Sequence, residues 1–180
     1  MYYTPYPYYN YMPMCNCQRQ QMYQHMPTNP NNYWSQRNVN NWLELRDHGK
    51  EPYVVNIEHA AEQNRTFRTA LWTGDHLQVT LMSLGVGEDI GLEVHPDVDQ
   101  FLRIEEGQGF VQMGNSRNNL TFERRVREDD AIMVPAGTWH NLTNTGNEAL
   151  KLYSIYAPPE HPFGTVHETK AEAMAAEGNY

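Results

Sequence analysis

Two stretches of this chain carry side chains whose types and spacing could do chemistry. In the first, Glu93, His95 and Asp97 alternate along the chain, and Gln100 follows after a turn-rich segment. In the second, His140 is followed at alternate positions by Leu142 and Asn144. Imidazole, carboxylate and amide groups at such spacing are typical of metal sites and of sites that transfer protons.

Strand geometry predicts how these residues share one pocket. Alternate residues of a strand point to the same side, so Glu93, His95 and Asp97 are expected on one face. The turn-rich segment after His95 can reset this alternation, which lets Gln100 face inward as well. We therefore predict one metal site formed by His95, Asp97, Gln100 and His140, backed by Glu93. Two imidazoles with oxygen donors suit a divalent ion of Fe, Mn, Co, Ni or Zn.

The second stretch resembles one of the two motifs of the cupin superfamily. The pattern Pro-x-Gly-x-x-His-x-x-x-Asn is complete as Pro135, Gly137, His140 and Asn144. Only the leading glycine of the motif differs, because Asp129 stands in its place. With the first motif upstream and in order, the resemblance covers roughly residues 66–157.

The first motif departs from the family pattern at two positions. His95 and Gly107 match its first histidine and closing glycine, but Asp97 replaces the second histidine and Gln100 replaces the glutamate. The resemblance implies a metal site in which Asp97 supplies the carboxylate beside two imidazoles. Alternatively, Asp97 is a turn residue and the pocket binds a ligand without metal. If Asp97 faces outward, Glu93 becomes the substitute carboxylate.

Short strands must position these residues. Apolar and β-branched runs bounded by Gly, Asn and Asp turns predict ten strands, and this spacing favours an antiparallel sandwich or barrel. The resemblance makes this an all-β double-stranded β-helix, the jelly-roll cupin barrel. Helix is expected only as a short turn at 41–47 and over 168–177, with Thr165 or Thr169 as the cap. The expected strands are 53–57, 66–72, 76–84, 92–95, 100–104, 109–113, 120–124, 131–134, 139–144 and 150–156.

The start of the chain has a different composition. Residues 1–43 contain eight of the 12 tyrosines and five of the 11 prolines, with no Asp or Glu. We predict a disordered low-complexity tail over 1–40 and a cupin domain over 41–180, with an arm and helix at 158–180. The tail is similar in composition to bacterial spore-coat proteins. Its Cys15 and Cys17 are expected to be exposed thiols able to form intermolecular disulfides, or alternatively a soft-metal site shared with His25 or Met14.

Charge and hydropathy exclude several function classes. The chain carries a net charge of −9, and all of its acidic residues follow residue 43, so we expect no nucleic-acid partner for the domain. No stretch reaches the roughly 20 apolar residues of a membrane span, so no membrane partner is expected. No signal-like segment opens the chain. We therefore expect a cytoplasmic protein, or one in the spore coat of a spore-forming bacterium.

Two functions remain open at this stage. The first is a metal-binding enzyme of the isomerase or dioxygenase kind, acting on a small molecule in the barrel with Glu93 or Asp97 as general base. The second is a non-catalytic structural or binding cupin that residues 1–40 recruit to a coat or surface assembly. Because cupins commonly pair barrels through edge strands, the resemblance also implies a homodimer.

Overall fold

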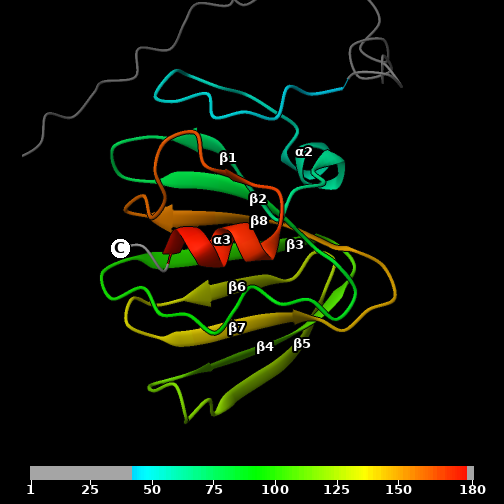
Figure 1. The fold of residues 1–180 in the computed structure, drawn as a ribbon, viewed down its shortest axis with the longest axis vertical. Coiled ribbons are helices and arrows are strands. Elements are labelled where there is room, and N and C mark those ends of the chain that lie inside the picture. The colour runs from blue at the N-terminus through cyan, green and yellow to red at the C-terminus, as the bar shows by residue number, and fades with distance from the viewer. Residues whose placement is uncertain (1–41, 178–180) are drawn as a thin grey trace, which may run out of the picture. The chain divides into compact units, whose positions relative to one another are not determined.

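Two antiparallel sheets make up the part of the protein that the computed structural model describes, residues 42–177 (Figure 1). The larger sheet has six strands in the order β6-β3-β8-β2-β1-β9, and the smaller has three in the order β5-β4-β7. The strands are β1 (Arg68–Thr73), β2 (Gln78–Leu84), β3 (Asp99–Glu106), β4 (Gln108–Gly114), β5 (Phe122–Arg127), β6 (Ala131–Val134), β7 (Trp139–Asn144), β8 (Leu150–Ala157) and β9 (Val166–His167).

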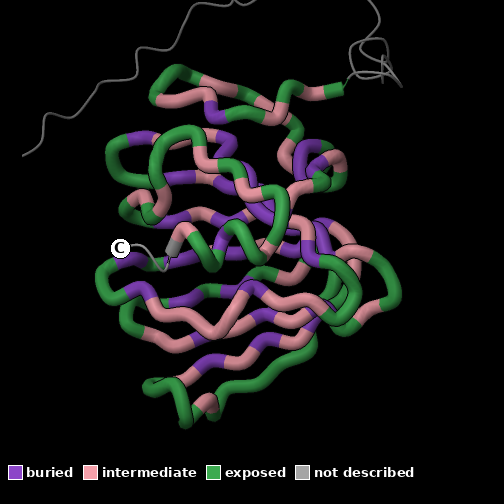
Figure 2. The backbone as a smooth tube through the Cα atoms, in the orientation of Figure 1, coloured by how far each residue is buried: buried purple, intermediate pink, exposed green. Residues whose placement is uncertain are grey.

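The core lies between the two sheets. β3, β4 and β7 alternate buried and partly exposed residues, as strands with one face toward a core do (Figure 2). Leu102 and Leu152 enter this core from the larger sheet, and Val111 and Leu142 enter it from the smaller one. The fold is therefore the predicted all-β antiparallel double-stranded β-helix.

Eight of the ten expected strands form, with ends shifted by a few residues. The expected strand at 92–95 is reduced to one isolated bridge at Glu93. The prediction of a strand at 53–57 is wrong, because residues 53–56 form no strand and α2 (Ile57–Gln63) begins at the last residue of the range. Asn56 caps this helix by accepting a hydrogen bond from the backbone N–H of His59 at 3.1 Å. The local β propensity therefore gives way to a capped helix.

Helix α2 packs on the outer face of the larger sheet. Its Ala60 and Ala61 are completely buried against Leu71 of β1 and Leu81 of β2, in a second apolar cluster. The helical turn expected at 41–47 does not form over the described residues 42–47. There Leu43 runs extended beside α2, where its backbone N–H and carbonyl both bond to the side-chain amide of a glutamine in the helix.

The expected C-terminal helix is present as α3 (Lys170–Glu177). Thr169 caps it, because its Oγ1 accepts a hydrogen bond from the backbone N–H of Glu172 at 3.3 Å. Within residues 42–177, no helix has the length and apolar content needed to span a bilayer. The predicted tail, with Cys15 and Cys17, lies outside the described residues.

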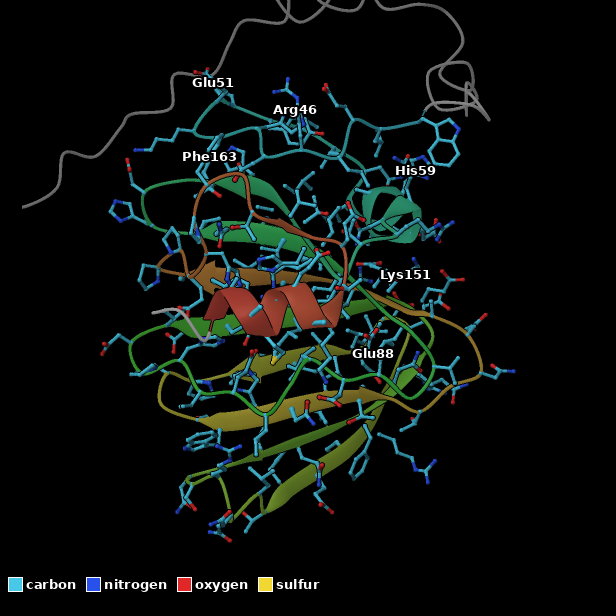
Figure 3. The ribbon with its side chains drawn as sticks, in the orientation of Figure 1. Arg46, Glu51, His59, Glu88, Lys151 and Phe163 are labelled. Atoms are coloured by element: carbon cyan, nitrogen blue, oxygen red, sulfur yellow. The ribbon has the colours of Figure 1, made fainter. Side chains whose placement is uncertain are left out.

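A buried lysine joins α2 to the larger sheet. Lys151 of β8 is only 2% exposed, and its Nζ donates to Ser83 Oγ at 2.9 Å and to the carbonyl of Asn64 at the end of α2 (Figure 3). Burial lowers the pKa of Lys151 to about 8. The charge therefore lies in the outer cluster, away from the space between the sheets.

Candidate metal centre

Backbone pairing with β7 positions the first two site residues. Glu93 forms an isolated antiparallel bridge with His140, with two N–H···O bonds of 3.0 and 2.9 Å. The carbonyl of His95 then accepts a hydrogen bond from the N–H of Gly137 at 2.8 Å. The segment before β3 is therefore held along β7, which brings the two motifs of the sequence together.

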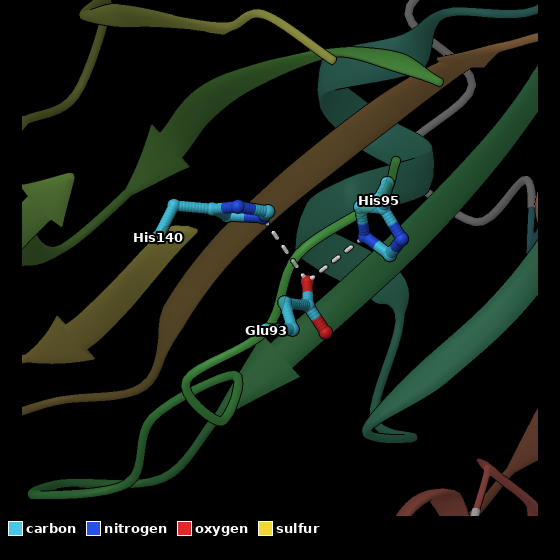
Figure 4. Close-up of side chains that lie close together, drawn as sticks. All are labelled: Glu93, His95 and His140. Carbon is cyan, nitrogen blue, oxygen red and sulfur yellow. Dashed lines mark ion pairs between the residues drawn. The ribbon is translucent and has the colours of Figure 1, made fainter. Parts of the chain in front are cut away.

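Three side chains converge at this pairing (Figure 4). One ligand atom from each of Glu93, His95 and His140 lies within 4.8 Å of the other two. Glu93 Oε1 is 3.4 Å from His95 Nε2 and 3.3 Å from His140 Nε2. The carboxylate therefore sits between the two imidazoles, whose ring centroids are 5.5 Å apart.

The far nitrogen of each imidazole is already engaged. His140 Nδ1 is 2.9 Å from the carbonyl of Thr138, which can only accept, so this nitrogen carries the proton. His95 Nδ1 is 3.0 Å from a carboxylate oxygen of Glu160. Both Nε2 atoms are buried and make no hydrogen bond within the described part of the chain. When the rings are neutral, both Nε2 lone pairs would therefore point at the place where the Glu93 carboxylate lies, as a metal ion requires.

The electrostatics of the group are strongly perturbed. Burial alone would raise the pKa of Glu93, but the close imidazoles of His140 and His95, 3.3 and 3.4 Å away, outweigh it and lower this pKa to about 2. Burial would lower the pKa of His95, but Glu160 and Glu93 outweigh that effect and raise it to about 9. The buried Glu93 carboxylate is thus stabilised only by nearby positive charge, which either protons on the two imidazoles or a bound metal ion would supply.

Only some of the residues that the sequence predicted for the metal site lie together in the structure. His95 and His140 come together as expected, but Asp97 does not join them. It is exposed in the turn before β3, because the chain forms only an isolated bridge at Glu93 and turns at Pro96, so the alternation that would have turned Asp97 inward does not continue. Glu93, named as the substitute carboxylate and as a general-base candidate, occupies the position between the imidazoles.

Gln100 is buried on β3, as the reset of the alternation required. Its Nε2 donates to Ser154 Oγ at 3.0 Å, whereas its Oε1 has no hydrogen-bond partner among the described residues. The oxygen is thus the atom that Gln100 could offer to a metal or a ligand. Its assignment as a metal ligand stays a prediction.

Sequence reasoning missed Glu160, which comes from the segment that follows β8. Gln78 anchors this segment, because its side chain bonds both the carbonyl and the N–H of His161, at 2.9 and 3.0 Å. Further on, the N–H of Gly164 donates to Asp47 Oδ2 at 3.0 Å. The cluster of prolines around Glu160 and His161 was the one available signal that this segment is held in place.

Two further motif residues have structural roles. Asn144 is 1% exposed, and its Nδ2 donates to three backbone carbonyls at 2.8–3.1 Å, which ties the end of β7 to the end of β2. Gly107 has a φ of +93°, and a Cβ added to it would lie 3.0 Å from the carbonyl oxygen of Ala149. These residues hold the barrel around the site without contributing to its chemistry.

Comparisons with known proteins agree with this architecture. Residues 80–156 match the model of the family described as "Cupin domain". The chain is 72% identical over 135 residues to the Bacillus subtilis protein YrkC, covering 75% of this chain and 73% of that one. It is 41% identical over 115 residues to protein L612 of Acanthamoeba polyphaga mimivirus, covering 63% and 70% respectively.

A solved structure is similar as well. The crystal structure of BH2720 from Bacillus halodurans shares 70% sequence identity with this chain, with a TM-score of 0.72. The match covers 72% of this chain and 98% of that one. The fold, the order of the two motifs and these similarities lead to one assignment. The chain belongs to the cupin family.

Proposed function

We propose that the protein is a metal-dependent cupin in which Glu93, His95 and His140 hold one divalent transition-metal ion. The observation that carries this proposal is the convergence of two buried Nε2 atoms and one carboxylate oxygen, each within 4.8 Å of the others. The opposite nitrogens are engaged by Thr138 and Glu160, which sets both rings to present Nε2.

The donor set fits Fe, Mn, Co, Ni or Zn, as two imidazoles and one carboxylate suit borderline divalent ions. Three protein ligands leave positions open for a small molecule. When bound, such an ion supplies a Lewis acid that polarises a carbonyl or hydroxyl, or a site for dioxygen. We propose accordingly an enzyme of the isomerase or dioxygenase kind.

Glu93 remains the candidate general base of this proposal. Its Oε1 faces both imidazoles, which lower its pKa to about 2, and a carboxylate with so low a pKa is a weak base, so this role stays a prediction. Asp97 is withdrawn from this role, because it is exposed in the turn and outside the group. Glu160 is assigned to hold the ring of His95, not to contact a ligand.

Metal content tests the proposal directly. The full-length protein would be loaded separately with each of the five metals, desalted, and measured by elemental analysis beside H95A, H140A and E93Q. H76A serves as the matched control, because His76 is exposed and lies outside the group. We expect about one ion per chain in the wild type and in H76A, and a loss in the other three. Equal metal in all five proteins would overturn the proposal.

A second candidate is a non-catalytic cupin that residues 1–40 recruit to a spore coat or another surface assembly. The composition of that tail favours it, since eight of the 12 tyrosines precede residue 44 and can stack or be cross-linked. Deleting residues 1–40 should then release the protein from the assembly without changing its metal content. Unchanged location of the deletion variant would refute this candidate.

We also propose a homodimer that pairs barrels through an edge strand. The larger sheet ends at β6 and β9, and an edge strand with unpaired backbone groups is a template for pairing with another chain. Light scattering of the full chain should give twice the mass of one chain. The mass of a single chain across the micromolar range would contradict this proposal.

A further inference from the structure

Four exposed arginines gather along one strand edge of this acidic protein. Residues 117–127, which cover the loop after β4 and strand β5, hold four arginines and one glutamate, a net charge of +3. The other residues after residue 43 include 21 acidic and seven basic ones, a net charge of −14. Figure 2 shows most of the stretch as exposed, at the bottom of the view. We call the four residues the arginine edge: Arg117, Arg124, Arg125 and Arg127.

The guanidinium groups of the arginine edge have no carboxylate partner. None of the four forms an ion pair with any residue between 42 and 177. The acidic residues that flank them are engaged elsewhere, because Glu123 accepts a hydrogen bond from Gln112 Nε2 at 2.9 Å and Asp129 pairs with Arg103. Four other basic side chains do pair with carboxylates: Arg46, Lys50, Arg103 and Lys170. The arginine edge is therefore positive charge that the domain leaves uncompensated.

Two of these guanidinium groups lie over aromatic rings. Arg124 Cζ is 4.7 Å from the ring centroid of Phe122, and Arg117 Cζ is 5.9 Å from that of Trp139. Stacking of this kind holds the guanidinium plane and leaves most of its N–H groups able to donate. A guanidinium held in this way loses less freedom when it binds a carboxylate through two parallel hydrogen bonds. The geometry thus favours recognition of carboxylates.

Strand β5 also offers its backbone to a partner. It is the outer strand of the smaller sheet, and only β4 pairs with it among the described residues. The other side of such a strand carries backbone N–H and C=O groups that an added strand can bond. Successive residues of a strand point to opposite faces, so Arg124 lies on one face and Arg125 and Arg127 on the other. An extended polypeptide with neighbouring carboxylates could therefore contact arginines on both faces.

Charge and symmetry decide between kinds of partner. A nucleic acid would bring a dense row of phosphates close to the remaining −14 charge of the domain, which repels it. A second copy that paired its own β5 with this one about a two-fold axis would bring two arginine edges together. Like charges on paired strands are destabilising. An acidic segment of a different protein meets neither obstacle.

We propose that the arginine edge docks an extended acidic segment of a partner protein, which adds as a strand beside β5. The backbone of the segment bonds the free side of β5, and its carboxylates bind guanidinium groups on both faces of the sheet. No residue of the arginine edge belongs to the group of Glu93, His95 and His140. The inference therefore goes beyond the proposed metal-dependent function and does not depend on it.

Binding of fluorescent probes to the full-length protein tests the inference. The main probe is a short peptide in which pairs of glutamates alternate with pairs of threonines. Three matched probes replace glutamate by glutamine, methylate the backbone nitrogens, or carry the same charge on an oligothymidylate. Fluorescence anisotropy should show that the glutamate peptide binds about tenfold more tightly than each of the others. Raising the salt concentration from about 50 to 500 mM should weaken this binding by about tenfold.

Substitutions that remove charge from the arginine edge should weaken the peptide. R124Q, R125Q and R127Q should each cost about threefold in affinity, and the triple variant about tenfold or more, because opposite-charge pairs across strands contribute modestly. R65Q is the matched control, since Arg65 is an exposed arginine just after α2. The replaced side chains are exposed, so the melting temperatures should stay near that of the wild type. If the triple variant fails to fold, the single variants carry the test.

Each contrary outcome names a different error. Equal affinity of the triple variant and the wild type, or of the glutamate and glutamine peptides, would overturn the docking surface. Binding of the oligothymidylate as tight as that of the peptide would replace the acidic protein by a nucleic acid. A change of mass in light scattering between wild type and triple variant would make a second copy the occupant. Metal content should be the same in all these variants, so a failure here leaves the proposed metal site untouched.

Discussion

Glu160 should control metal affinity although it is not a ligand. Its Oε1 lies 3.0 Å from His95 Nδ1, where it accepts the ring proton and fixes the ring with Nε2 toward Glu93. Replacing it by alanine frees the ring to turn and removes a carboxylate that makes Nε2 a better donor. The replacement of Glu160 therefore changes metal affinity only through the ring of His95.

The expected loss of metal affinity depends on how far the side chains of Glu160 and His95 are exposed to solvent. Loss of such an outer carboxylate typically costs 10–100-fold in metal affinity. The side chain of Glu160 is 31% exposed, against 9% for His95, so solvent weakens the interaction. We expect about tenfold weaker binding for E160A, which corresponds to about 1.4 kcal/mol. E160Q keeps an acceptor oxygen and should lose only about threefold.

The assay is a competition for Zn²⁺ between the full-length protein and a chromophoric chelator at constant pH. E128Q is the matched control, because Glu128 is an exposed glutamate in the turn between β5 and β6. The order of affinity should be wild type and E128Q first, E160Q next and E160A last. An E160A affinity within twofold of wild type, in a protein that melts normally, would refute the assigned role of Glu160.

Three further predictions concern stability. Asn144→Ala should lower the free energy of unfolding in urea by about 2 kcal/mol, because one buried and two partly buried carbonyls lose their donor, and an unchanged value would refute that role. Gly107→Ala should cost at least about 1 kcal/mol more than Gly137→Ala, because both have positive φ but only at Gly107 would the added Cβ meet backbone atoms. Equal costs would contradict this. The folded-state pKa of Lys151 is lowered from 10.5 to about 8, so the folded chain binds fewer protons than the unfolded chain between these values and stability rises with pH there. The free energy of unfolding of the wild type minus that of Lys151→Met should therefore increase by about 1–3 kcal/mol between pH 7.5 and pH 10. A difference that does not change with pH would contradict this prediction.

The sequence predicted the barrel and the two histidines because local patterns encode them. Alternation along the strands and turn residues between them mark most of the sheet. His140 could be placed because its motif is complete, and backbone pairing then brings it to the same bridge as Glu93. These features depend on residues close together in the chain.

Features that depend on contacts between distant segments were predicted wrongly or missed. Asp97 was expected to face inward, but alternation holds only while the strand continues, and the chain turns at Pro96. The β-branched run at 53–57 was read as a strand, although packing of two alanines on the outer sheet face favours the helix that follows. No local pattern reports that Glu160 folds back onto His95.

The central claim is that Glu93, His95 and His140 share one metal ion, and anomalous X-ray diffraction from crystals of the Zn²⁺-loaded protein tests it most directly. The account predicts one strong anomalous peak about 2.0–2.1 Å from the Nε2 atoms of both histidines and about 2.0–2.2 Å from a Glu93 oxygen. A peak bound elsewhere, with the two Nε2 atoms free of metal at full zinc loading, would contradict it.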